Sequence, residues 1–365
     1  MKTMMMARNL VTDLSGPRYA IEVARQLALM GNQVLIPTSN PRVRVENVQV
    51  VKLPGVFANR AVSPIAYSSY ARFARAKYRV EIVHGNGYSL FDDVTTVHFQ
   101  TRAFEERFNY YASGKIGSSS GQIMAERIIW KSSKHLIAVS NMVKQDLVRL
   151  YGVSDEKISV VHNGVTLDEF SPSTQSEKEE LLKKYGLESD KLLLLFVGGS
   201  AYERKGFRFL LEALPQFSSN VMVIAVCRNL APEFRDVISR LKVSDRIIIE
   251  SYIPDISKIY RAVDMYVLPT IYDPFPLAVL EAMASKLPVI VSSLTGAVDI
   301  IENGRNGMII KDPRDAYEFS NAVNVLAESE TARRQMASNA RGTVEKMSWK
   351  DVAREVRQIY ESVAK

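Results

Sequence analysis

Short apolar segments alternate along the chain with longer amphipathic ones. In the first half, the apolar runs predict seven strands, at residues 2–6, 33–36, 48–52, 81–84, 94–97, 135–139 and 157–161. Apolar positions at helical spacing predict helices over residues 18–30, 65–76, 122–131 and 141–151. This alternation is typical of βαβ units and predicts a parallel sheet.

The alternation restarts in the second half. The predicted strands are residues 192–197, 221–226, 246–250, 265–268, 289–292 and 308–310. Helices are predicted between these strands, and two more are predicted over residues 316–328 and from Trp349 to the end of the chain. Residues 192–196 are apolar throughout, which suits a sheet covered by helices on both faces. We therefore predict an α/β chain with two Rossmann-like, doubly wound domains.

Residues 171–180 are polar and lack an apolar period, so they are the best candidate for a linker. The predicted domains are residues 1–172 and 173–349, with the last helix, about 350–365, packing back on the first domain. Doubly wound sheets bind ligands at the carboxyl ends of their strands. If those ends face each other, the site is a central cleft between the domains.

Composition narrows the class of protein. The 365 residues are 47% hydrophobic, yet no run of eighteen apolar residues predicts a transmembrane helix. The apolar start, residues 1–7, is too short for the core of a signal peptide and is interpreted as a buried strand. A single cysteine, Cys227, fits a reducing compartment, so we expect a cytoplasmic protein.

The net charge of +7 is unevenly placed. Residues 1–170 contain 21 Lys and Arg against 14 Asp and Glu, whereas residues 171–365 contain 26 of each. The basic excess is either a solvated surface or a contact with an anionic partner, such as a phosphorylated lipid or the cytoplasmic face of a membrane. No nucleic-acid motif accompanies the charge, so no nucleic-acid partner is expected.

Residues 197–206 follow an apolar strand and contain Gly198 and Gly199, then Arg204, Lys205 and Gly206. Glycines allow a sharp turn, and the following helix N-terminus favours an anion. Two cations at the same place would suit a diphosphate. The alternative is a glycine turn with two solvated bases, since the segment is neither a Walker loop nor a Gly-x-Gly-x-x-Gly motif.

Two carboxylates stand eight positions apart after the strand at 265–268. Asp273 lies before a helix predicted to start at Pro276 and Leu277, and Glu281 lies about one turn inside it. Carboxylates suit sugar recognition because they accept hydrogen bonds from hydroxyl groups. The alternative roles are a helix-dipole partner and an incidental helix acid, although Glu281 lies in an otherwise apolar segment. A second glycine turn, around Gly296, follows the next strand.

Taken together, these segments resemble glycosyltransferase family 4, whose members are retaining enzymes of the GT-B fold. The resemblance spans nearly the whole chain and is strongest over residues 157–307. Residues 158–165 resemble the family's Asn-Gly-Val interdomain segment, and residues 203–206 its basic diphosphate loop. Residues 273–281 resemble its Glu-x7-Glu signature, and 281–284 its Glu-Ala-Met-Ala stretch.

The resemblance implies roles for the second domain. Arg204 and Lys205 would bind the pyrophosphate of the donor, Asp273 would lie near the donor sugar, and Glu281 would bind the ribose hydroxyls. The residues implied to line the sugar and offer backbone groups are Phe275, Pro276 and Leu277, and those implied to hold the base are Ser251, Tyr252 and Ile253.

In the first domain, the resemblance implies that Gly16 lies beside the phosphates and that His98 lies near the transferred sugar. His84 and His135 are interpreted as structural. The chain departs from the family's pattern at Asp273, where the family has Glu, and at Gly199, where many members carry another basic residue. Ser15-Gly16 replaces a double glycine, and Asp299 stands where the family usually has Glu.

The implied reaction transfers a hexose from a UDP- or GDP-sugar to a glycan or a lipid-linked acceptor. Arg204 and Lys205 would stabilise the leaving diphosphate, with Asp273 and His98 completing the catalytic set. No histidine or cysteine cluster has metal-ligand spacing, and Asp92-Asp93 lacks a partner, so we expect neither metal nor cofactor. The alternatives are a nucleotide-sugar epimerase of similar architecture and a non-catalytic sugar-nucleotide-binding protein.

Overall fold

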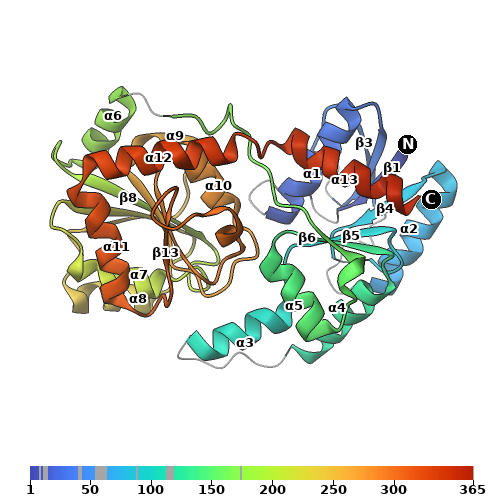
Figure 1. Ribbon diagram of the computed structural model, residues 1–365, viewed down its shortest axis with the longest axis horizontal. Coiled ribbons are helices and arrows are strands. Elements are labelled where there is room, and N and C mark those ends of the chain that lie inside the picture. The colour runs from blue at the N-terminus through green and yellow to red at the C-terminus, as the bar shows by residue number, and fades with distance from the viewer. Residues whose placement is uncertain are drawn as a thin grey trace. The chain divides into compact units, whose positions relative to one another are not determined.

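The computed structural model describes residues 1–7, 10, 15–39, 43–53, 64–87, 89–111, 119–172 and 175–364. They form two compact units. One comprises Met1–Glu106, Ile116–Gly164 and Met347–Lys365, and the other comprises Arg107–Lys115 and Val165–Lys346. Each unit contains one parallel sheet with helices around it (Figure 1).

The first sheet has seven strands in the order β3-β2-β1-β4-β5-β6-β7, and every pair is parallel. This confirms the predicted sheet, including its start in a buried N-terminal strand. The strands are β1 Lys2–Met6, β2 Gln33–Thr38, β3 Val48–Lys52, β4 Ile82–Gly85, β5 Val94–Val97, β6 His135–Ala138 and β7 Ile158–Val160.

The helices of the first half are α1 Ser15–Leu29, α2 Pro64–Tyr78, α3 Thr101–Tyr111, α4 Ser120–Ser132 and α5 Asn141–Tyr151. Helix α5 begins where the Ser140 hydroxyl accepts a hydrogen bond from the N–H of Val143, and it ends at Gly152 in the left-handed conformation. The C-terminal helix, α13 Trp349–Val363, belongs to this unit and packs on α1.

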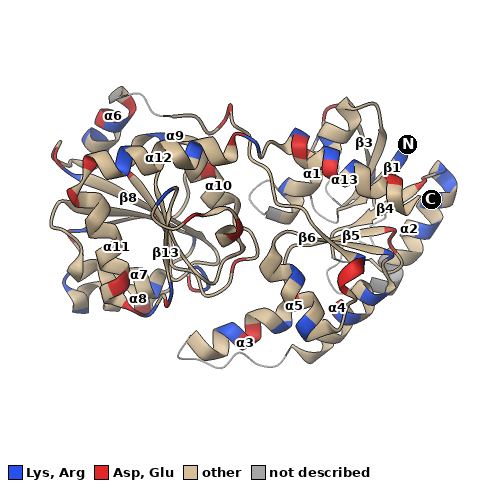
Figure 2. Cartoon of the chain, viewed as in Figure 1, with Lys and Arg blue, Asp and Glu red and all other residues tan. Residues whose placement is uncertain are grey.

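The second sheet has six parallel strands, again as predicted, and their order is β10-β9-β8-β11-β12-β13. They are β8 Leu192–Gly199, β9 Val221–Cys227, β10 Ile247–Glu250, β11 Met265–Leu268, β12 Val289–Ser292 and β13 Met308–Ile310. The strands are almost free of charged residues, which gather on the helices and loops (Figure 2). A sheet covered on both faces requires this distribution.

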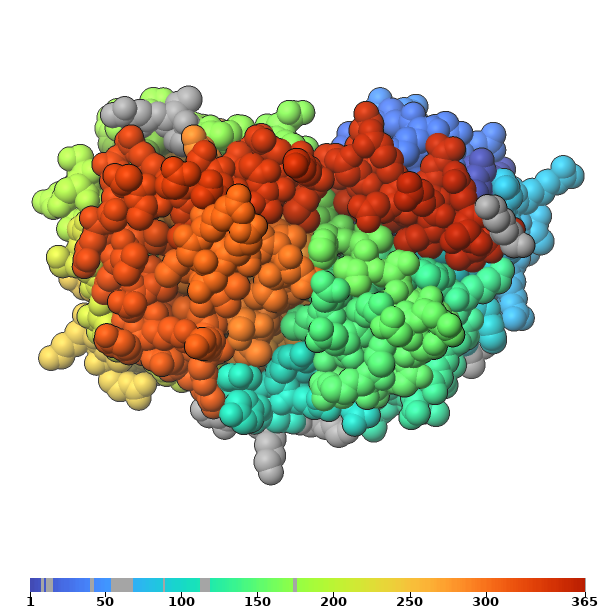
Figure 3. Space-filling model, in the orientation of Figure 1, coloured from blue at the N-terminus to red at the C-terminus, as the bar shows by residue number. Residues whose placement is uncertain are grey.

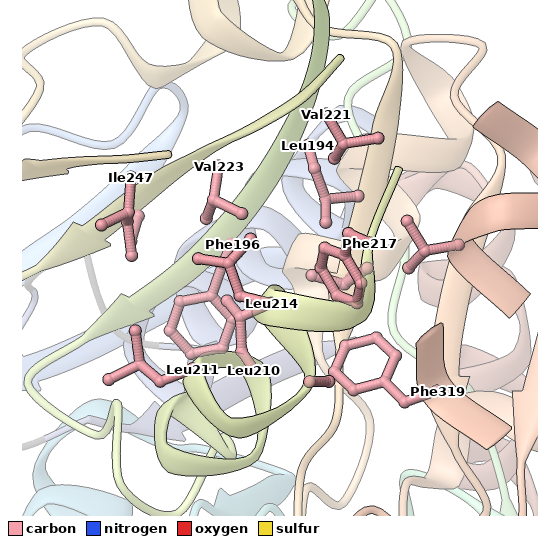
Figure 4. Close-up of a cluster of buried hydrophobic side chains, with 14 of the residues drawn as sticks. Leu194, Phe196, Leu210, Leu211, Leu214, Phe217, Val221, Val223, Ile247 and Phe319 are labelled. Atoms are coloured by element: carbon pink, nitrogen blue, oxygen red, sulfur yellow. The ribbon is translucent and has the colours of Figure 1, made fainter. Parts of the chain in front are cut away.

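The helices of the second unit are α6 Gln175–Tyr185, α7 Phe207–Ala213, α8 Pro232–Leu241, α9 Ile256–Ala262, α10 Leu277–Ala284, α11 Ala316–Glu328 and α12 Glu330–Val344. Helices α11 and α12 cover much of the face of this unit that is turned to the viewer in Figure 3. Leu194 and Phe196 of β8 meet Leu210 of α7 and Phe319 of α11 in a fully buried core (Figure 4). Each such side chain contributes roughly 1.5–3 kcal/mol to folding.

The predicted linker at 171–180 is wrong over its second part, because α6 begins at Gln175. Two buried residues, Leu181 and Leu182, attach this helix to its unit. Glu177 pairs with Arg261 at 2.7 Å, and Lys178 pairs with Asp264 at 2.7 Å. The polar composition that suggested a linker therefore belongs to a helix held partly by ion pairs.

Helix α13 is joined to the first sheet by a buried polar chain. Tyr360 Oη lies 2.6 Å from His84 Nδ1, and His84 Nε2 lies 2.7 Å from Thr96 Oγ1, which donates to Tyr19 Oη at 3.1 Å. Burial lowers the pKa of His84 to about 3, so the ring is neutral near pH 7. Because Thr96 donates to Tyr19, it accepts from His84 Nε2, and Tyr360 donates to Nδ1.

Replacing Tyr360 by Phe should destabilise the first unit. The change leaves a buried ring nitrogen of His84 without its donor, which costs about 1–3 kcal/mol. We expect a lower thermal unfolding midpoint, followed by circular dichroism. The control is Tyr317→Phe on α11, since Tyr317 is 75% exposed. Equal midpoints for the two variants would contradict this role of Tyr360.

Candidate active site

Three loops lie at the carboxyl edge of the second sheet, after the neighbouring strands β8, β11 and β12. The Arg204 carbonyl, in the loop after β8, accepts hydrogen bonds from Ile271 N–H at 3.0 Å and from Thr270 Oγ1 at 2.9 Å, both after β11. The Asp273 carbonyl accepts from Gly296 N–H at 2.8 Å and from Thr295 Oγ1 at 3.1 Å, both after β12. Hydrogen bonds to these two main-chain carbonyls thus fix the loops to one another.

Gly206 is required for this arrangement. Its φ is +86°, and an added Cβ would lie 1.8 Å from the carbonyl oxygen of Pro269. Gly198 is also confined, since a Cβ there would lie 2.6 Å from Cβ of Tyr202. The glycines that suggested a phosphate loop therefore also allow two stretches of main chain to approach closely.

Arg204 and Asp273 form an ion pair at this edge. Arg204 Nη1 lies 3.3 Å from Asp273 Oδ2, and the two side chains are 19% and 10% exposed. The same nitrogen also donates to the Tyr272 carbonyl. The guanidinium of one loop and the carboxylate of the next are therefore held within ion-pair distance.

Lys205 lies beside the same charges. Its Nζ donates to the Val197 carbonyl at 3.0 Å. Burial lowers the pKa of Lys205, Asp273 and Glu281 oppose the change, and Arg204 adds to it. The structure therefore brings together Arg204, Lys205, Asp273 and Glu281, the four charged residues predicted for the second unit.

Glu281 lies on α10, whose other residues from Ala278 to Ala284 are buried, while Glu281 itself is half-buried. The helix begins at Leu277 after Pro276, as predicted, and no side chain caps it. Phe275 is 3% exposed and Pro276 is buried. Of the three residues predicted to line the sugar, only Leu277 is partly exposed.

The structure adds Tyr266 on β11, a residue predicted only to lie in a strand. Its side chain is fully buried, and its hydroxyl has no hydrogen-bond partner among the described residues. Burial raises the pKa of Tyr266, and Asp273 and Glu281 raise it further. The only sequence signal was a tyrosine in an otherwise apolar strand.

The residues predicted for the base, Ser251, Tyr252 and Ile253, follow β10 at the sheet's outer edge. Ser251 is exposed, Tyr252 is 56% exposed and Ile253 is half-buried. The sheet order separates them from the four charged residues, because β9 lies between β10 and β8.

In the first unit, Gly16 and His98 are neighbours. A Cβ on Gly16 would lie 3.4 Å from His98 Cδ2, and His98 Nε2 lies 3.2 Å from Asn86 Oδ1. The ring packs edge-on against Tyr19 with centroids 4.8 Å apart. Burial lowers the pKa of His98 to about 4, so it is a neutral hydrogen-bonding group near pH 7.

Asp92 and Asp93 have partners within the same unit. Asp93 pairs with Arg75 at 2.9 Å and with Lys134 at 2.7 Å. Asp92 accepts from Ser89 at 2.6 Å, and burial raises the pKa of its carboxyl to about 7. These contacts explain both residues as part of the fold.

Two family descriptions match the chain. Glycosyl transferases group 1 matches residues 177–343, and Glycosyltransferase Family 4 matches residues 16–169. The chain belongs to glycosyltransferase family 4. It is an enzyme that transfers a sugar from a nucleotide sugar.

Curated relatives are distant. A glycosyltransferase of Methanocaldococcus jannaschii is 28% identical over 235 residues, which cover 62% of this chain and 60% of the relative. D-inositol 3-phosphate glycosyltransferase from Xylanimonas cellulosilytica is 24% identical over 382 residues, which cover 95% of this chain and 91% of the relative.

Solved structures share the fold. WaaG, a glycosyltransferase involved in lipopolysaccharide biosynthesis, superposes with a TM-score of 0.80 at 19% identity, covering 98% of this chain and 99% of WaaG. Anabaena Alr3699/HepE in complex with UDP-glucose gives 0.78 at 16% identity, covering 99% and 100%. These likenesses confirm the predicted GT-B fold with its two Rossmann-like sheets.

Replacing Gly206 by Ala should disrupt this site, because the new methyl group would meet the Pro269 carbonyl. Gly304→Ala is the matched control, since Gly304 has φ +79° and nothing within 4 Å of an added Cβ. Both variants bear left-handed strain, so the clash alone should cost Gly206→Ala roughly 1–3 kcal/mol more in unfolding free energy. Equal losses in urea denaturation would show that the close approach is unimportant.

Proposed function

We propose that the enzyme transfers a hexose from a UDP- or GDP-sugar to a glycan or lipid-linked acceptor, with retention at the anomeric carbon. The grouping of Arg204 and Lys205 with Asp273 and Glu281 at the carboxyl edge of the second sheet carries this proposal. A nucleotide-sugar donor offers a diphosphate for the two bases and hydroxyl groups for the two acids. The structure of Alr3699/HepE with UDP-glucose supports a donor of this class.

In the proposed reaction, the bond between the anomeric carbon and the diphosphate oxygen breaks, and its electron pair goes to that oxygen. Arg204 and Lys205 stabilise the charge that grows there. The acceptor hydroxyl attacks from the leaving-group side, and its proton passes to the departing phosphate. Asp273 positions the sugar, Glu281 binds the ribose, and Phe275, Pro276 and Leu277 offer backbone groups.

In the first unit, we assign Gly16 to the phosphates and His98 to the transferred sugar. Neutral His98 would hydrogen-bond a sugar hydroxyl rather than supply charge, because its pKa is lowered to about 4. Ser251, Tyr252 and Ile253 are assigned to the base. The reaction as proposed uses neither a metal nor a cofactor.

Replacing Lys205 by Met should lower turnover by about 10²–10³-fold, because it removes charge stabilisation from the leaving diphosphate while keeping a long side chain. The donor is first identified by screening UDP- and GDP-sugars for thermal stabilisation of the enzyme. Turnover of that donor by Lys205→Met is then compared with its turnover by Lys258→Met. The control variant removes an exposed lysine of α9.

Unchanged turnover in Lys205→Met, with the unfolding midpoint preserved, would refute the assigned role. The same assay without acceptor separates the alternatives. An epimerase would isomerise a labelled donor. A binding protein would be thermally stabilised by the donor but would not turn it over.

We further propose that the first unit contacts an anionic lipid surface at the cytoplasmic face of the membrane, where a lipid-linked acceptor would lie. No helix within the described residues is long and apolar enough to span a bilayer. Helix α2 instead exposes Phe73 at 60%, with Lys77 Nζ 5.7 Å from its ring centroid. The preceding residue, Arg72, has its Cζ 4.9 Å from the ring centroid of Phe91, and Phe91 is 57% exposed. Aromatic rings flanked by cations suit a lipid interface.

The double variant Phe73→Ser, Lys77→Gln should sediment less with phosphatidylglycerol vesicles than the parent enzyme. Each lost cation near an anionic surface costs about 1 kcal/mol, or roughly fivefold in binding, and the lost ring costs more. The control is Tyr317→Ser, Lys311→Gln, an exposed pair in the second unit. Equal sedimentation of both variants with phosphatidylglycerol vesicles would contradict the proposal. So would a parent enzyme that binds neutral phosphatidylcholine vesicles as well as phosphatidylglycerol vesicles.

A further inference from the structure

Arg228 joins the candidate phosphate loop to the predicted base segment. It is the first residue after β9, and its N–H donates to the Gly199 carbonyl at 2.9 Å. Gly199 ends β8 with a left-handed φ of +57° and opens the loop that contains Arg204 and Lys205. The hydrogen bond therefore fixes the main chain of Arg228 beside that loop.

The side chain of Arg228 reaches the other way, toward Tyr252. Its Cζ lies 5.7 Å from the centroid of the Tyr252 ring. Tyr252 is the second residue after β10, and both side chains are exposed at the carboxyl edge of the sheet. Because β9 lies between β8 and β10, Arg228 stands between the phosphate loop and Tyr252.

Two flat, exposed groups at such an edge suit a flat ligand. A tyrosine ring and a guanidinium both stack on nucleobases, with little dependence on which base is present. The guanidinium also has N–H donors in its plane and no acceptor. It therefore suits the O4 of uracil or the O6 of guanine, whereas cytosine and adenine place an amino donor at the corresponding position.

We infer that Arg228 completes the base site of the donor beside Tyr252, which is already assigned to the base. Tyr252 supplies a stacking surface, and Arg228 selects a base with a keto oxygen over one with an amino group at that position. This inference rests on the proposed function, since it names the residues that distinguish nucleotides within the same donor site.

Calorimetry with UDP, CDP, GDP and ADP tests the inference on the full chain. The parent enzyme should prefer UDP to CDP, and GDP to ADP, by about 5- to 150-fold, since one good hydrogen-bonded pair to a base is worth about 1–3 kcal/mol of discrimination. Arg228→Met keeps the length of the side chain but removes its donors, so both preferences should fall to near one. Tyr252→Ala should weaken the binding of all four nucleotides by similar factors, about 5- to 100-fold.

Inorganic pyrophosphate and a matched variant provide the controls. Arg240→Met removes an exposed arginine of α8 and should leave all affinities and both preferences unchanged. Pyrophosphate should bind Arg228→Met as it binds the parent enzyme. If its affinity falls as far as that of UDP, Arg228 acts on phosphate and the inference is overturned.

Two further outcomes separate this inference from the proposed function. If the parent enzyme discriminates between the bases and Arg228→Met keeps the same preferences, the inference fails while the proposed function stands. If the parent enzyme binds none of the four nucleotides and none of the UDP- or GDP-sugars, the proposed function itself fails.

Discussion

The carbonyl group of Arg204 holds the candidate active site together. It accepts hydrogen bonds from Ile271 N–H and the Thr270 hydroxyl, so the main chain after β8 is tied to the main chain after β11. Two residues further on, Gly206 lets the Pro269 carbonyl approach to a distance that no side chain would allow. Because these loops follow neighbouring strands, a few main-chain contacts suffice to place the bases of one loop against the acid of the other.

Charge balance is the second constraint on this site. Two bases and two acids lie close together, and burial makes it costly to leave any of them unpaired. Arg204 pairs with Asp273, and Lys205 donates to the Val197 carbonyl. In the proposed reaction, an incoming diphosphate would compete with Asp273 for Arg204 and with a main-chain carbonyl for Lys205. Donor binding would therefore exchange existing contacts for stronger charge-assisted ones rather than fill a preformed anion site.

The first unit contributes a different kind of chemistry. Burial keeps His84 and His98 neutral, and their neighbours are hydroxyl and amide groups rather than carboxylates. His84 connects the sheet to α13, the last helix of the chain, so residues 276 positions apart form one polar chain. His98 packs against Tyr19 of the same network and lies beside Gly16. The C-terminal helix thus contributes to the surroundings of a residue predicted to contact the sugar.

The sequence by itself determined the strands and the loops after them, because runs such as Leu192–Phe196 are apolar enough to be buried on both faces and glycines mark the turns that follow. It did not separate helix α6 from a linker, since that helix is held by the partners Arg261 and Asp264, which lie far along the chain. Helix α12 was also missed, although Ser329 caps it and Met336, Ala340 and Val344 form its buried face. Arg228 gave no sequence signal of a role, and the only signal at Tyr266 was a tyrosine in an otherwise apolar strand. Each is defined by residues that the strand order brings near. Only the order β10-β9-β8-β11-β12 decides which loops become neighbours, and that order depends on how the helices cross over the sheet.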